Sequence, residues 1–336
     1  MRNKFMLIVF SLLVSVLLLA GCGNESKDSG ASSEEEAVDF SKKPIKLIVP
    51  WSAGGITDVT ARLLAEEAVN HLPEGAEVVV ENRPGGTGTI GAAEVANAEA
   101  DGFTLLISPL VPVTESPSIR QTPYEYDDFD PVLQVLSTPT AFAVGTSNDI
   151  ATYEDFVQYA KDNPGEFKYA TGGVGTLDHI VMEAIALKEN IDIKHVPYEG
   201  AAPIINDILG GHIDGGHLQI PGLLPYVEEG DVRIAWNSGS EGFAYMPKDT
   251  PTLEGKLDLP EMDAKTSIVG PKGIPEETLN IIVDAFKKTM DSEKFKEKME
   301  NANLEPAFAG PEELGETIET RYQTSKKIIE ESGIAE

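Results

Sequence analysis

The chain has 336 residues and a formal net charge of -30, with 26 Lys and Arg residues against 56 Asp and Glu residues. A surface this acidic argues against binding to nucleic acid and against docking on anionic lipid. Because Cys22 is the only cysteine, an internal disulfide and a cysteine-based metal cluster are excluded.

The first segment has the pattern of an export signal. Two early cations precede an apolar run that ends at Leu19. The residues Leu19 to Cys22 are similar to a bacterial lipobox, so we expect residues 1–21 to be a lipoprotein signal peptide and Cys22 to be lipidated. An ordinary signal followed by an incidental cysteine is the alternative. Residues 22–41 are polar and acidic, which is typical of a flexible tether.

The folded part opens with a strand, a glycine turn and a helix. About 295 residues follow the tether, more than one core usually holds, which favours two lobes. Ile45 to Val49 predicts a strand, and a helical period begins at Ile56 after Gly54 and Gly55. The first N–H groups of a helix are unpaired and carry positive potential, so this turn suits a carboxylate or a phosphate. An ordinary βα turn, in which a nearby Thr or Asp caps the helix, is equally open.

A second loop of the same kind occurs far along the chain. Residues 167–170 predict a strand, residues 171–176 read Thr-Gly-Gly-Val-Gly-Thr, and a helix is predicted from Leu177. If one such loop comes from each lobe, the facing helix N-termini would hold a molecule with an anionic group at each end.

A third glycine segment raises the question of a nucleotide. Gly86, Gly88 and Gly91 match G-x-G-x-x-G, but the next predicted strand ends in Ser108-Pro109 where an acidic residue should hold a ribose. We therefore predict a close-packed glycine turn and no cofactor. Because G-x-S-x-G, Walker A and H-E-x-x-H motifs are absent from the sequence, we expect no enzyme activity.

The histidines do not form a convincing metal motif. His212, Asp214 and His217 lie close in sequence, and surface histidines around a turn are a better interpretation than a metal site. His179 lies one turn into the helix behind the second glycine loop, where it could face a ligand or support the loop.

The remaining predicted elements frame these loops. Residues 108–123 predict an irregular connection, and the β-rich run 132–144 is long enough to pass between lobes. Three late helices, at 275–289, 292–302 and 311–334, are expected to pack a lobe, with prolines in the first turns of the first and third.

The sequence contains five marker segments between residues 43 and 334. They are Pro50 to Arg62, Val80 to Gly86, Asp101 to Leu106, Val196 to Gly200, and Pro251 to Leu253 with Val269 to Pro275. In these markers the chain resembles the extracytoplasmic solute-binding proteins of tripartite tricarboxylate transporters (the Bug/TctC-like family).

The resemblance implies an α/β, two-lobed periplasmic-binding-protein fold, of the Venus-flytrap, type II-like kind, with two hinge-crossing strands. It places lobe 1 at residues 42–139 plus 266–336 and lobe 2 at residues 140–265. It implies a di- or tricarboxylate or related organic acid held largely by backbone amides. The residues it implies for ligand binding are Ser52, Ala53, Gly54, Gly55, Thr57 and Asp58 in one loop, Thr171, Gly172, Gly173, Gly175 and Thr176 in the other, and Ser108, His179, Tyr198 and Asp214 in the cleft wall.

The five arginines after the signal support this picture, because none lies in either loop and amides must supply the positive potential. The chain departs from the family at Glu199, where a basic residue is common, and this weighs against a highly charged tricarboxylate.

The resemblance also implies the partners and the location. We expect a monomer, held by its N-terminal lipid at the outer face of the cytoplasmic membrane, that delivers its ligand to membrane permease subunits. The alternatives are a ligand-sensing partner of a membrane signalling protein and a surface-anchored nucleotide-dependent enzyme.

Overall fold

The computed structural model describes residues 38–198, 200–239, 245–248, 250–253 and 263–335. The predicted signal peptide, the predicted lipidation site Cys22, most of the predicted tether and Glu199 lie outside these residues. None of the helices in the described ranges is long and apolar enough to cross a membrane.

Six strands form the first sheet, in the order β11-β4-β10-β3-β1-β2. Their bounds are Ile45–Val49 (β1), Val78–Asn82 (β2), Thr104–Pro109 (β3), Phe129–Thr138 (β4), Ala264–Pro271 (β10) and Pro306–Ala309 (β11). Strands β1, β2 and β3 are parallel, and β10 is antiparallel to both β3 and β4. In β1 every residue except Lys46 is buried, as expected for a parallel strand covered on both faces.

Helices cover this sheet. Their bounds are Ile56–Ala68 (α2), Thr89–Ala96 (α3), Glu276–Asp291 (α10), Glu293–Asn301 (α11) and Pro311–Ser332 (α12). Helices α10 and α11 pack on α2, and α12 packs on β4. The predicted irregular connection contains two short helices, Val111–Thr114 (α4) and Ser116–Ile119 (α5). The prolines of this segment suggested a loop, but each lies in the first turn of a helix, where proline is tolerated. Single 3-10 turns lie at Gly86–Gly88 (η1), Tyr126–Asp128 (η2) and Ile220–Gly222 (η3).

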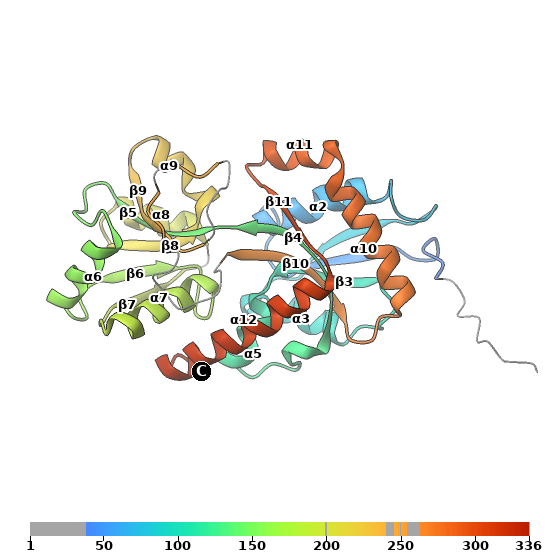
Figure 1. Ribbon diagram of the computed structural model, residues 1–336, viewed down its shortest axis with the longest axis horizontal. Helices are drawn as coiled ribbons and strands as arrows, with labels where there is room; N and C mark the ends of the chain where they lie inside the picture. The colour runs from blue at the N-terminus through green and yellow to red at the C-terminus, as the bar shows by residue number, and fades with distance from the viewer. Residues whose placement is uncertain (1–37, 199, 240–244, 249, 254–262, 336) are drawn as a thin grey trace, which may run out of the picture. The chain divides into compact units, whose positions relative to one another are not determined.

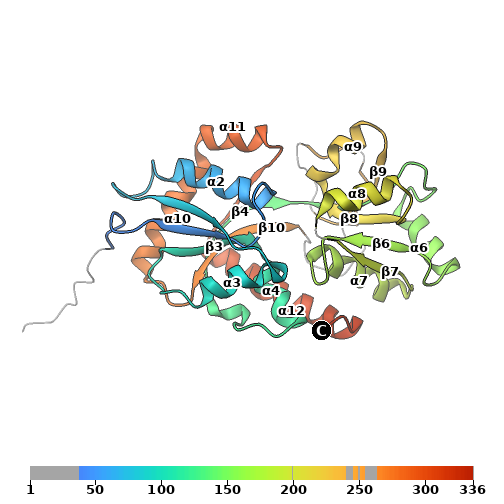
Figure 2. The same cartoon turned by 180° about the vertical axis from the view of Figure 1, so that it is seen from behind.

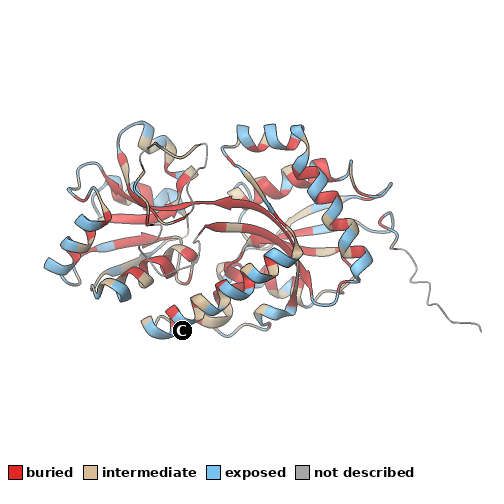
Figure 3. Ribbon diagram, in the orientation of Figure 1, coloured by how far each residue is buried: buried red, intermediate tan, exposed pale blue. Residues whose placement is uncertain are grey.

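Five strands form the second sheet, in the order β7-β6-β8-β5-β9. Their bounds are Thr140–Gly145 (β5), Lys168–Thr171 (β6), Lys194–Pro197 (β7), Gly215–Gln219 (β8) and Val232–Asn237 (β9), and the helices are Tyr153–Asp162 (α6), Leu177–Glu189 (α7), Ala201–Leu209 (α8) and Leu224–Glu228 (α9). An aromatic core lies against this sheet, with Phe142 stacked on Trp236 at a ring-centroid distance of 4.4 Å. Figure 3 shows the buried strands against the exposed outer faces of the helices.

One residue, Pro139, separates the two sheets along the chain. The predicted run 132–144 is two strands, β4 in the first sheet and β5 in the second, and Figure 1 shows β4 leading into β5. Both β3 and β4 are antiparallel to β10, so β4 ends at the carboxyl edge of β1 and β3. Strand β5 is antiparallel to β8, which is parallel to β6, so β5 starts at their carboxyl edge. The carboxyl edges of the two sheets therefore meet at Pro139.

Helix α12 contributes to both parts of the structure. Ile328 and Ile329 belong to the hydrophobic cluster of Phe142 and Trp236 beside the second sheet. Contacts between α12 and α7 accompany them, and Figure 2 shows these elements from behind. The resemblance implied lobe 1 for residues 266–336, and within that range the last turns of α12 share a core with the second sheet.

Candidate functional site

Both predicted glycine loops lie where parallel sheets bind ligands. Strand β1 pairs with β2 on one side and β3 on the other, and β6 pairs in the same way with β7 and β8. The chain passes from β1 to β2 on one side and then returns past β1 to β3 on the other side. The connections of β6, β7 and β8 follow the same course. Ligands of open α/β sheets bind outside the carboxyl ends of the strands at such points of reversal. Residues 50–55 follow β1 and residues 172–176 follow β6.

Asp58 holds the first loop in shape. Its carboxylate accepts the Gly54 N–H at 2.8 Å, two guanidinium N–H groups of Arg62 at 2.9 and 3.1 Å, and the Asn82 side-chain amide at 2.9 Å. Burial raises the pKa of Asp58, but these hydrogen bonds outweigh burial, so the pKa is lowered and the group stays ionised. Asn82 also donates to the Trp51 carbonyl at 3.0 Å. The Asp58 carboxylate thus stabilises the loop through hydrogen bonds to groups of the protein itself.

The first loop leaves its helix N-terminus open. No side chain caps α2, and within the described residues the amides of Gly55, Ile56 and Thr57 have no hydrogen-bond partner. Gly54 has φ +87°, and a Cβ on it would meet no atom within 4 Å. Unpaired amides beside open space at the positive end of a 13-residue helix are an arrangement that can donate hydrogen bonds to an anion.

Ser108 joins this loop through Trp51. It lies near the end of β3, is 2% exposed, and accepts a hydrogen bond from the Trp51 indole Nε1 at 3.3 Å. Ser108, predicted for the cleft wall, thus lies against a residue at the start of the first loop.

Thr171 and His195 brace the start of the second loop. The Thr171 hydroxyl donates to the Gly173 carbonyl at 3.0 Å, and it lies 2.7 Å from His195 Nε2. Since the hydroxyl proton is used, His195 donates from Nε2, as a neutral imidazole can. Burial and the nearby His179 lower the pKa of His195 to about 3, although Glu183 opposes the shift.

His179 braces the end of the second loop. Its Nδ1 accepts the Gly175 N–H at 3.1 Å, and its Nε2 lies 3.4 Å from Glu183 Oε1. The ring stacks on His195 at 3.9 Å between centroids. Glu183 also accepts from the Tyr169 hydroxyl at 2.9 Å, and although burial raises its pKa, the bonds from His179 and Tyr169 lower it overall. His179 is 3% exposed, and its ring faces the loop backbone at Gly175.

The second loop also leaves amides open. Thr176 caps α7 by accepting the His179 N–H at 3.4 Å. Among the described residues the amides of Gly172 and Val174 have no hydrogen-bond partner, and a Cβ on Gly172 would meet no atom within 4 Å. The Gly175 amide, in contrast, is occupied by His179.

The segment α4–α5 contacts both loop regions. A Cβ on Gly88 would lie 2.5 Å from Pro112 and 3.4 Å from Trp51, while a Cβ on Gly175 would lie 2.0 Å from Ile119. The segment that the sequence treated as a plain connection therefore packs beside Trp51 at one end and beside the second loop at the other.

The two other predicted wall residues differ in position. Tyr198 donates its N–H to the Thr171 carbonyl at 3.0 Å, so its backbone lies at the second loop, and its hydroxyl bonds Asp207. Asp214 accepts the Lys168 N–H at 2.7 Å, at the start of β6 and thus at the opposite edge of the sheet from the loop. The structure does not bring Asp214 to the site, because it precedes β8 whereas ligands bind beyond strand ends.

The G-x-G-x-x-G segment is closed by packing. Cβ atoms on Gly86, Gly88 and Gly91 would lie 2.4 Å from Thr89, 2.5 Å from Pro112 and 2.8 Å from Pro50, respectively. The space where side chains would stand is filled by neighbouring atoms, as expected for a close-packed turn.

His217 is not the surface residue that the sequence indicated. It is fully buried on β8, whereas His212 is exposed. Across the described residues no three His, Cys, Asp or Glu side chains are placed to hold a metal ion. The supporting roles of Arg62, Asn82 and His195 were not predicted from the sequence. Asn82 lies in β2 and His195 in β7, and their positions in strands that end at the site are the signal that could have identified them.

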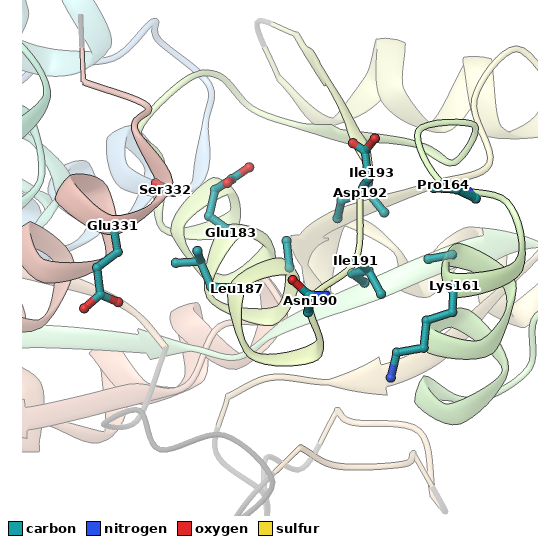
Figure 4. Close-up of a pocket in the computed structure, with 12 residues that line it drawn as sticks. Lys161, Pro164, Glu183, Leu187, Asn190, Ile191, Asp192, Ile193, Glu331 and Ser332 are labelled. Atoms are coloured by element: carbon teal, nitrogen blue, oxygen red, sulfur yellow. The ribbon is translucent and has the colours of Figure 1, made fainter.

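A cavity of about 580 Å³ lies elsewhere, at the far end of α7. Figure 4 shows Lys161, Glu183, Asp192 and Glu331 around it. Neither glycine loop lines this cavity, so it is separate from the candidate site.

Comparison with known proteins agrees with this geometry. The sequence model of the protein family described as tripartite tricarboxylate transporter family receptor matches residues 60–334. A UPF0065 protein of Cupriavidus necator, from the gbd 5′ region, is 30% identical over 306 residues, covering 90% of this chain and 91% of the relative.

Solved structures show the same fold. A TctC solute-binding protein from Polaromonas, solved without ligand, superposes with a TM-score of 0.74 at 27% identity, covering 87% of this chain and 100% of that one. A protein of R. palustris solved with adipate has a TM-score of 0.73 at 26% identity and covers 88% and 99%. Since the family model spans most of the chain, this protein belongs to the tripartite tricarboxylate transporter receptor family of extracytoplasmic solute-binding proteins, which are not enzymes.

Proposed function

We propose that this receptor captures a small organic acid with a carboxylate at each end, one in the loop of residues 52–58 and the other in the loop of residues 171–176. It is anchored by a lipid on Cys22 and delivers the acid, as a monomer, to the permease subunits of a tripartite tricarboxylate-type transporter. The lobes, at residues 42–139 plus 266–336 and 140–265, close on the ligand about the crossing strands.

The pair of open helix N-termini carries the proposal. Each loop follows a parallel strand and presents amides that have no hydrogen-bond partner among the described residues. Each also contains a glycine, Gly54 or Gly172, whose Cβ would meet no atom within 4 Å. Each begins a 13-residue helix, whose dipole adds positive potential at the loop. Two such ends suit an acid with two anionic groups better than one with a single anionic group.

The supporting comparison concerns ligand chemistry. The R. palustris relative was solved with adipate, a dicarboxylate. The arginine nearest the first loop, Arg62, is already paired with Asp58, so amides rather than a guanidinium would meet the acid. The lipid anchor and the permease are supported by the lipobox-like residues and by the family's name.

A thermal-shift screen of the soluble chain from Gly23 tests the proposed ligand. The panel contains the straight-chain dicarboxylates from succinate to suberate, with citrate, amino acids and NAD. A ligand that binds only the folded state adds about 2.7 kcal/mol to the free energy of unfolding at a hundredfold excess over its dissociation constant. We expect a shift with at least one dicarboxylate; a shift with NAD alone, or with none of the panel, contradicts the proposal.

The variant Gly172→Val tests the second loop. Gly172 has no positive φ and no neighbour within 4 Å of its Cβ, so valine fits the fold but fills the space beside the open amides. We expect dicarboxylate affinity to fall at least about tenfold, measured by titration calorimetry. Gly310→Val is the matched control, since its Cβ would meet only Phe308 at 4.0 Å, and it should bind as the wild type does. Unchanged affinity in Gly172→Val would refute the two-loop site.

A further inference from the structure

A hydrogen-bonded chain of three side chains, centred on a buried histidine, ends beside the second loop. Asp178 Oδ1 lies 2.7 Å from His217 Nδ1, and His217 Nε2 lies 2.8 Å from Ser238 Oγ. These residues come from α7, from β8 and from the segment after β9. His217 is fully buried, while Asp178 and Ser238 keep part of their surface exposed.

The topology places both ends of this chain at the ligand edge. Asp178 is the second residue of α7, directly behind the loop of residues 171–176. Strands β8 and β9 are both antiparallel to β5, so β9 runs in the direction of β8 and β6. Ser238 follows the carboxyl end of β9 and therefore lies at the same edge as the loop.

The order Asp, His, Ser has the hydrogen-bond pattern of a serine hydrolase. Hydrolysis also needs amides that stabilise an oxyanion next to the serine. The Ser238 N–H donates to the Thr140 carbonyl at 2.8 Å, and the Gly239 N–H donates to Asn237 Oδ1 at 2.9 Å. Both neighbouring amides are occupied, so the geometry favours binding over attack.

The proton positions follow from the partners. Asp178 as a carboxylate only accepts, so His217 carries a proton on Nδ1. While the ring is neutral, Nε2 accepts the Ser238 proton, and the hydroxyl offers only lone pairs outward. When Nε2 also binds a proton, it donates to Ser238 Oγ, and the hydroxyl proton turns outward as a donor. A ligand carboxylate needs a donor at this point.

We propose that Ser238 contacts the ligand carboxylate held by the second loop, and that one proton from solvent binds His217 when the carboxylate binds. The inference rests on the proposed function and extends it to a specific residue. His217 and Asp178 are positioning residues. Within the described part of the chain, the His217 ring is bonded to the Asp178 carboxylate on one side and to the Ser238 hydroxyl on the other.

Titration calorimetry at pH 7 in HEPES and in Tris tests this inference, with the tightest dicarboxylate of the succinate-to-suberate series as probe. The two buffers differ in heat of ionisation, so a difference in binding heat measures protons taken up. We expect uptake in the wild type, and in Ser238→Ala an affinity at least about tenfold lower with no uptake, since a hydrogen bond to a charged group is lost. Ser238→Thr, which keeps the hydroxyl, should retain uptake.

The control is His212→Gln, because His212 is exposed and outside this chain of bonds. It should leave affinity and uptake unchanged. Equal heats in both buffers for the wild type, or unchanged affinity in Ser238→Ala, overturns the inference while Gly172→Val still tests the two-loop site. If no dicarboxylate binds the wild type, the proposed function fails and this inference fails with it.

Discussion

At the scale of single residues, the site depends on polar side chains that hold loop backbone in place. Asp58 fixes the first loop through the Gly54 amide, and His179 fixes the second through the Gly175 amide. Because these amides are occupied, the amides left for a ligand are their neighbours. Side chains predicted as ligand contacts thus serve here to shape the surface that a ligand would meet.

His195 makes stability depend on pH. Its pKa is lowered from 6.5 to about 3 in the fold, so between these values the unfolded chain binds more protons than the folded one. The free energy of unfolding therefore falls as pH drops from about 6.5 towards 3, by at most about 1.4 kcal/mol per pH unit from this group. The partial exposure of the ring limits the pKa shift and so the total loss of stability.

Urea denaturation of His195→Gln across this pH range measures the effect. Glutamine can keep the bond to Thr171 but binds no proton, so the dependence on pH should be shallower than in the wild type. His212→Gln should follow the wild type. Parallel pH profiles for the wild type and His195→Gln would contradict the assignment.

At the scale of elements, α12 links the short helices to the crossing connections through one buried ion pair. Arg321 Nε donates to Glu115 Oε1 at 2.6 Å, and Nη1 donates to the Asp263 carbonyl at 3.1 Å. Ser325 adds a bond to Glu115 at 3.1 Å, and Asp263 accepts from Ser137 at 2.9 Å. The link therefore ties α12 to the end of β4 and the start of β10, where the chain crosses between sheets.

Removing one partner of this pair should be costly. In Arg321→Leu the Glu115 charge stays buried without its counter-charge, so we expect about 3–5 kcal/mol less free energy of unfolding. The double variant Arg321→Leu with Glu115→Gln should recover part of this loss, because no unpaired charge remains. Equal stabilities of Arg321→Leu and the wild type in urea denaturation would show that the pair contributes little.

At the scale of the whole molecule, the acidic charge opposes the ligand that the site attracts. The net charge is -30, whereas the proposed ligand is an anion and the positive potential comes from two helix ends. Long-range repulsion reaches about 30 Å at 0.01 M salt but about 8 Å at 0.15 M. On the proposed function, capture would therefore depend on short-range hydrogen bonds from amides, with the field of the surface acting against approach.

The association rate should consequently rise with salt. Stopped-flow fluorescence of Trp51, beside the first loop, can follow dicarboxylate binding between 0.01 and 0.15 M NaCl. We expect a faster rate at higher salt, opposite to electrostatic steering of an attracted ligand. A monocarboxylate should show a smaller change, and a rate that falls with salt would contradict this view.

The sequence alone predicted much of this protein, since its strongest signals are local. Turns with glycine and the apolar period of a helix depend on nearby residues, so β1 with α2 and β6 with α7 could be predicted as strand-loop-helix units. The two-lobed fold followed from the family markers, which the comparisons confirm.

Only the tertiary structure decided which distant side chains meet. His195 reaches Thr171 because β7 pairs with β6, and Ser238 reaches His217 because β8 and β9 flank β5. The sheet also places Asp214 at the edge opposite the loops and buries His217. A buried polar group must find a partner, and the partner is fixed by sheet order, which local sequence patterns do not contain.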